Sequence, residues 1–164
     1  MLNRVKAGLT AGLAAGLAVA VMILVYDLVK LEPLATPRLL ASNVLGAPVE
    51  LSDGLGVLAW TAGVLKVSWS IILYAIAHFS IFAVVGVVAA FVFGSAVLSA
   101  NIATGAAYGG LVGTAVFYAG LALMAPQFIA APDWRLVVLM NAFAGVVLVS
   151  QLVDHPVGEE TAAV

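Results

Sequence analysis

The chain has 164 residues, of which 65% are hydrophobic, while only six are Lys or Arg and eight are Asp or Glu. Soluble domains are about half apolar and need a more charged surface than this sequence provides, so the composition excludes a soluble fold. The absence of cysteine excludes disulfides, iron–sulfur clusters and thiolate zinc sites, and a net charge of −2 without a basic stripe excludes a nucleic-acid surface.

Four apolar segments predict four membrane-spanning helices. A hydrocarbon core of about 30 Å needs roughly 17–25 helical residues, and only helices satisfy all backbone groups within one segment in lipid. We therefore expect an all-α integral membrane four-helix bundle that forms a single transmembrane domain over 1–164. The expected spans are 7–29, 67–93, 102–124 and 135–152, with a long loop at 30–66.

The first span follows the basic residues Arg4 and Lys6. Its apolar run reaches Val29, longer than the roughly 7–15 residues of a signal-peptide core, so we expect the span to be retained. The loop side carries more basic residues than the terminal side, which opposes cytoplasmic termini, but the flank of the first span usually dominates. We expect both termini in the cytoplasm.

The long loop contains an apolar stretch, Leu55–Leu65, directly before the second span. A single helix from Leu55 to Phe93 would have 39 residues, far more than one crossing needs. We therefore expect a separate short interfacial or re-entrant helix, anchored at the membrane boundary by Trp60, Lys66 and Trp69.

Two glycine rows with a spacing of four lie in the first and third spans. The rows are Gly8, Gly12 and Gly16, and Gly105, Gly109 and Gly113. Residues four apart share a helix face, so each row forms a groove where another helix can approach closely. The simplest use is packing of the first span against the third; a contact with another copy or another subunit is the alternative.

The rows also indicate an internal repeat of two helical hairpins. The second and fourth spans share a similar stretch, His78-Phe-Ser and Asn141-Ala-Phe, with Gly86 and Gly145 downstream. Two similar hairpins would form a bundle with approximate two-fold symmetry about the membrane normal. The alternative is that spans rich in Ala, Gly and Val resemble one another by composition.

His78 lies near the centre of the second span, where ionisable residues are costly and often functional. Helix rise places Tyr74, Tyr118 and Asn141 in the same half of the bilayer, so a cluster with His78 is geometrically possible. Three uses remain open: a structural hydrogen bond, an axial ligand to haem or a pigment, and a quinone or lipid-headgroup pocket.

The spans contain no carboxylate pair, Ser-His-Asp set, zinc-protease motif or phosphate loop. Asp27 lies at the edge of the first span, which makes a small proton-coupled transporter the weakest alternative. We therefore predict a non-enzymatic accessory or scaffold subunit in the lipid bilayer, which associates with other membrane subunits or with itself. No resident metal or cofactor is expected unless His78 is a haem, pigment or quinone ligand in an electron-transfer subunit.

Several segments together resemble the small four-helix bacterial inner-membrane proteins of the YagU kind. They are Gly8-Leu-Thr-Ala-Gly12, the break from Glu32-Pro33 to Pro37-Arg38, Ala77-His78-Phe-Ser80-Ile-Phe82 with Gly86, and Met124-Ala125-Pro126. The resemblance implies a multi-pass protein of the bacterial inner membrane and carries no reaction. The family pattern implies a second histidine in the last span, where this chain has Asn141.

Overall fold

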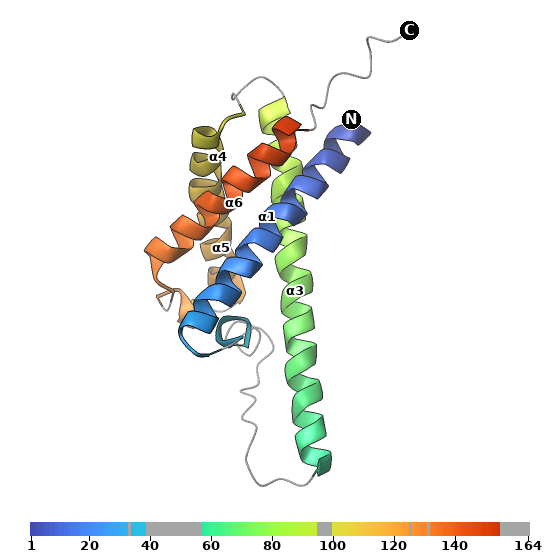
Figure 1. Ribbon diagram of the computed structural model, residues 1–164, viewed down its shortest axis with the longest axis vertical. Coiled ribbons are helices and arrows are strands. Elements are labelled where there is room, and N and C mark those ends of the chain that lie inside the picture. Colours follow the sequence, from blue (N-terminus) through green and yellow to red (C-terminus); the bar gives the residue numbers. More distant parts are fainter. Residues whose placement is uncertain (33, 39–56, 95–99, 125, 131, 155–164) are drawn as a thin grey trace. The chain divides into compact units, whose positions relative to one another are not determined.

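The computed structural model describes residues 1–32, 34–38, 57–94, 100–124, 126–130 and 132–154. These residues form helices and connecting turns, with no β-strand among them (Figure 1). Four helical segments are long and apolar enough to cross a membrane, at Leu2–Val29, Ile71–Phe93, Ile102–Leu123 and Trp134–Val153. The all-α four-helix class expected from the apolar segments is confirmed.

Helix α1 (Leu2–Val29) ends in a tight turn. The Leu31 amide donates to the Leu28 carbonyl at 3.0 Å and the Glu32 amide to the Asp27 carbonyl at 3.0 Å, the pair of bonds that defines a Schellman motif. This motif needs a left-handed residue, which is usually glycine; here Leu31 adopts it with φ 59°. Leu34 is also left-handed, with φ 65°, so the turn holds two strained leucines.

Helix α3 (Val57–Gly94) is a single helix of 38 residues. The expected separate interfacial helix at Leu55–Leu65 is therefore wrong: the described part of that stretch, from residue 57, continues directly into the second span. Membrane thickness limits the length of the apolar crossing, Ile71–Phe93, and not the length of the whole helix. The helix continues without a break because residues 57–94 contain no proline. The N-terminal turns of α3 precede this crossing.

The third span consists of three consecutive helical pieces: α4 (Ile102–Tyr108), the π-helical turn η1 (Gly109–Gly113) and α5 (Thr114–Met124). Asn101 caps α4 by accepting a hydrogen bond from the Thr104 amide at 2.9 Å. The Asn101 amide donates to the Thr104 hydroxyl at 3.1 Å, which completes a capping box. The span thus begins where the sequence analysis placed it and contains a π-turn that was not expected.

Helix α6 (Trp134–Asp154) forms the fourth span. The 3-10 turn η2 (Pro126–Phe128) lies between α5 and α6. Asp133 caps α6, because its carboxylate accepts a hydrogen bond from the Arg135 amide at 2.9 Å.

The contacts divide the chain into two compact units. One unit comprises Met1–Met22 with Phe79–Val164, and the other comprises Ile23–His78. Within the first unit, the start of α1, the end of α3, the start of α4 and the end of α6 lie at the same end (Figure 1). Consecutive spans of this unit therefore run in opposite directions.

Replacing Leu31 with Gly should stabilise the protein by about 1 kcal/mol, because the left-handed conformation costs an L-residue about 1–2 kcal/mol and glycine nothing comparable. Leu28→Gly is the matched control, since it lies within α1 and should instead lose about 1 kcal/mol. Reversible unfolding by sodium dodecyl sulfate, followed by circular dichroism, measures both. A destabilised Leu31→Gly variant would contradict the strain assigned to this turn.

Candidate functional site

The first glycine row packs against the C-terminal part of α3. A Cβ atom added to Gly8 would lie 2.6 Å from the Val87 Cα, and one added to Gly12 would collide with the Phe82 carbonyl. A Cβ added to Gly86 of α3 would lie 2.6 Å from the Cα and N of Gly12. Cβ atoms essentially never approach other atoms this closely, so the two backbones meet only because neither glycine carries a side chain.

The second glycine row packs in the same way against α6. A Cβ added to Gly105 would lie 2.8 Å from the Gly145 carbonyl oxygen, and one added to Gly109 would collide with the Asn141 carbonyl. Gly113 lies against the Asn141 side chain, whose Oδ1 would be 2.7 Å from an added Cβ.

These contacts correct the expected pairing of the first span with the third. Each row faces the span that follows it in the chain, so the glycines close two hairpins. All six glycines have their nearest neighbours within the chain. The grooves are therefore filled, and neither is free for a partner.

The two hairpins are equivalent in detail, with a corrected register. Gly86 meets the Gly8 carbonyl and the backbone of Gly12, just as Gly145 meets the Gly105 carbonyl and the backbone of Gly109. This equivalence aligns Asn141 with Phe82, and not with His78 as the sequence similarity predicted. His78 precedes Gly86 by eight residues, whereas Asn141 precedes Gly145 by four. One register therefore cannot align His78 with Asn141 and also Gly86 with Gly145.

Asn141 is a buried polar side chain in the second hairpin, with 9% of its surface exposed. Its Nδ2 donates to the carbonyl of Val137, one turn earlier in α6, at 2.9 Å. One N–H of the amide is thus paired within its own helix, and Gly113 provides the space for the side chain. In the first hairpin Phe82 lies at the equivalent place, against Gly16.

The π-turn places a polar atom without a partner in the third span. Thr114 follows Gly109–Gly113, and its hydroxyl oxygen is the one buried side-chain N or O atom of the described residues that lacks a hydrogen bond. A helical threonine normally bonds a carbonyl one turn earlier, whereas a π-turn displaces those carbonyls.

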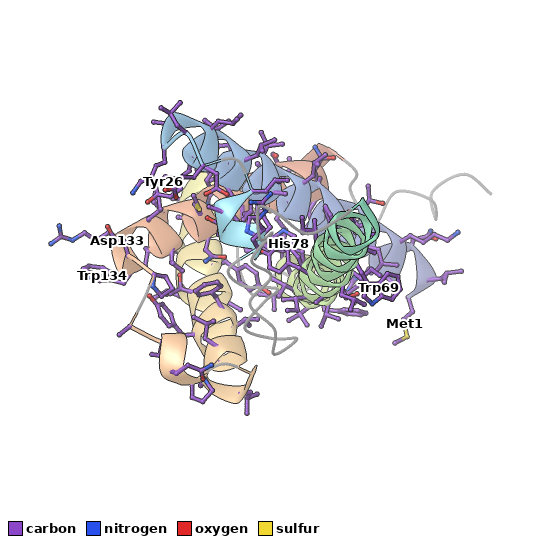
Figure 2. All side chains as sticks on the ribbon, turned by 90° about the horizontal axis from the view of Figure 1, so that it is seen from below. Met1, Tyr26, Trp69, His78, Asp133 and Trp134 are labelled. Atoms are coloured by element: carbon purple, nitrogen blue, oxygen red, sulfur yellow. The ribbon has the colours of Figure 1, made fainter. Side chains whose placement is uncertain are left out.

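His78 and Tyr74 lie one turn apart on α3. Their ring centroids are 5.7 Å apart and the planes are inclined by 33°. His78 lies on the side of α3 opposite the exposed Trp69 (Figure 2). The pair forms part of the unit Ile23–His78.

Tyr118 and Asn141 belong to the other unit. Tyr118 forms an edge-to-face contact with Phe117, with ring centroids 5.4 Å apart. Of the four residues expected to cluster, Tyr74 and His78 form a pair on α3, and Tyr118 and Asn141 belong to the other unit. A common binding site formed by all four stays a prediction. Binding of haem, a pigment or a quinone at such a site also stays a prediction. In the described part of the chain, no group of three His, Asp or Glu residues could hold a metal ion.

Tyr108 is a connecting residue that the sequence analysis missed. Its hydroxyl donates to the Val85 carbonyl of α3 at 3.2 Å, and its ring lies edge-on to Phe93 with centroids 5.5 Å apart. Tyr108 thereby joins the second hairpin to the first.

Asp27 is a second polar site whose geometry the sequence does not reveal. Its side chain is 2% exposed. Oδ2 accepts a hydrogen bond from the Thr36 amide at 2.9 Å, and Oδ1 accepts one from the Thr36 hydroxyl at 2.6 Å. Asp27 thus connects the end of α1 with Thr36 in the segment that follows the helix.

Cations and aromatic rings pair at the ends of the spans. The Lys30 amine lies 5.0 Å from the Tyr26 ring centroid, and a hydrogen bond with Tyr26 raises the pKa of Lys30 above its usual value. The Arg135 guanidinium lies 5.6 Å from the ring of Trp134, which is labelled at the start of α6 in Figure 2. Such pairs are typical of the membrane–water boundary.

No protein-family model, no curated protein and no solved structure matches this chain.

The glycine contacts should control stability. Gly12→Ala and Gly109→Ala should each cost about 1–3 kcal/mol, because overpacking moves two backbones apart. Gly120→Ala is the matched control: an added Cβ there meets nothing within 4 Å, so the change should be neutral or stabilise by up to about 1 kcal/mol. Unfolding of the three variants by sodium dodecyl sulfate measures the difference, and equal stabilities would refute the hairpin contacts.

Proposed function

We propose that this chain is a non-enzymatic subunit of a membrane assembly, which associates with a transmembrane helix of another subunit through the outward face of its third span. The observation that carries the proposal is a mismatch in that span. It is the least apolar of the four, yet it is also the least buried within the chain.

The comparison between spans is direct. The most apolar part of the third span has a mean hydropathy of 1.5, against 2.2–2.4 for the other three. Only 11% of that part is buried inside the chain, against 22–39% for the others. A span exposed to lipid on most sides is expected to be the most apolar, so a protein partner accounts better for this composition.

The outward face of the third span is built from small residues. Exposed positions recur every four residues from Ala103 to Ala119, with Leu111 at the centre as the one large side chain. The small members of the face are Ala103, Ala107, Ala115 and Ala119. Small side chains let a second helix approach closely, and close packing is the main source of helix association in lipid.

The glycine rows support this choice of surface by exclusion. Both rows are filled by the chain's own helices, so an association surface has to lie elsewhere. The resemblance to small bacterial inner-membrane proteins supports an assembly in that membrane, and the basic flank formed by Arg4 and Lys6 supports cytoplasmic termini.

Native mass spectrometry of the protein, extracted gently from its membrane, tests this function. We expect the chain to carry a further polypeptide, either a second copy with a total mass of twice 16.7 kDa or a different subunit. Ala107→Leu and Ala115→Leu should weaken the association about tenfold or more, because a contact worth about 1.4 kcal/mol changes the dissociation constant by that factor.

Ala77→Leu is the matched control, since Ala77 is an exposed alanine of α3 outside this face. It should leave the association unchanged. A monomer without any bound polypeptide, or equal association of all three variants, would overturn the proposal.

A further inference from the structure

The π-turn η1 leaves polar groups in the middle of the third span that the proposed association does not use. Thr114 directly follows this turn, twelve residues after Ile102, where the apolar crossing begins. At a rise of about 1.5 Å per residue, this is about 18 Å into the bilayer, close to the middle of a core of about 30 Å. The Thr114 hydroxyl oxygen is buried there and has no hydrogen-bond partner among the described residues. It needs one, because lipid offers none.

The backbone of the same turn departs from the regular hydrogen-bond ladder. The Thr114 amide donates to the Leu111 carbonyl, three residues back, whereas in an α-helix it would donate to the Gly110 carbonyl, four residues back. Residues four apart share a helix face and side chains tilt toward the N-terminus, so the Thr114 hydroxyl lies over the turn that contains Gly110. A hydroxyl and a carbonyl that both lack this α-helical partner are therefore one turn apart on one side of the span.

Gly110 provides space beside this carbonyl. A Cβ atom added to Gly110 would lie 3.6 Å from the Ala142 Cβ and 4.0 Å from the Val138 Cγ1, which are ordinary contact distances. At Gly109, by contrast, an added Cβ would collide with the Asn141 carbonyl. The turn thus has room at Gly110 for a group of about the size of a methyl group, which is also about the size of water. This space faces α6, so it is separate from the outward face proposed for the partner helix.

A further acceptor faces the turn from α6. The Oδ1 atom of Asn141 lies beside Gly113, where it would be 2.7 Å from an added Cβ. The described hydrogen bond of the Asn141 side-chain amide uses its Nδ2 and not this oxygen. The turn and its neighbour on α6 therefore offer one hydroxyl and two carbonyl oxygens, which matches the roughly three hydrogen bonds of a typical buried water.

We propose that the π-turn binds a water molecule between the Thr114 hydroxyl and the Gly110 carbonyl. The hydroxyl donates to the water oxygen, and the water donates to the carbonyl; its second hydrogen is available to Asn141 Oδ1. Ordered water commonly satisfies buried polar groups that the protein itself does not pair, and water inserted into the helical ladder distorts a helix locally. The middle of the third span is then hydrated, although apolar side chains and lipid surround it.

Water-edited solid-state NMR of the full, isotope-labelled chain in lipid bilayers tests this site. Magnetisation is transferred from water protons to the protein and compared residue by residue. We expect Thr114 to receive several-fold more magnetisation than Ala144, which lies near the middle of the fourth span and is 3% exposed. Equal transfer to the two residues would overturn the site, because a dry turn at this depth has no neighbouring water.

Two variants locate the water. Thr114→Val keeps the shape of the side chain and removes the hydroxyl, and Gly110→Ala fills the space beside the carbonyl; each should reduce the transfer at the amides of residues 110–114 to the level at Ala144. Thr114→Ser keeps the hydroxyl and should retain the transfer. Gly120→Ala is the matched control, since a Cβ added there meets nothing within 4 Å, and it should change nothing. Transfer that persists in both Thr114→Val and Gly110→Ala would also overturn the site, since the water would then lie elsewhere.

Discussion

Two backbone contacts, Gly12 against Gly86 and Gly109 against Gly145, set the distance between the helices of each hairpin. Lipid tails are as apolar as the helices, so apolar surface alone gives little reason for helices to associate. Dispersion must supply the attraction, and it falls steeply when a gap opens between surfaces. The packing of Phe82 against Gly16 and of Asn141 against Gly113 belongs to the same two interfaces and needs the same close approach.

Apolar segment lengths predict the helical class and the four spans because the bilayer imposes one thickness on all of them. The same reasoning misplaced the start of α3, since membrane thickness limits a crossing and not a helix. The glycine rows were visible as a spacing of four, but their partners were not. A row of glycines indicates that another helix approaches closely, but it does not indicate which helix that is.

The polar sites were less predictable for a related reason. His78 and Tyr74 could be paired from helical spacing alone, because they lie one turn apart on the same helix. The bonds between Asp27 and Thr36 cross a turn that depends on two left-handed leucines, and leucine carries no sequence signal for that conformation. The contact between Tyr108 and Val85 depends on the relation of two hairpins, which no local pattern specifies.

The equivalence of Phe82 and Asn141 has a consequence for membrane insertion. A phenyl ring enters lipid without a hydrogen-bonding requirement, whereas an amide needs a partner on the way in. For Asn141 this partner lies in the same helix, since its Nδ2 donates to the Val137 carbonyl one turn earlier. The last helix can therefore cross into the bilayer before it meets the third span, and the order in which the second hairpin's two helices enter places no constraint on this amide donor.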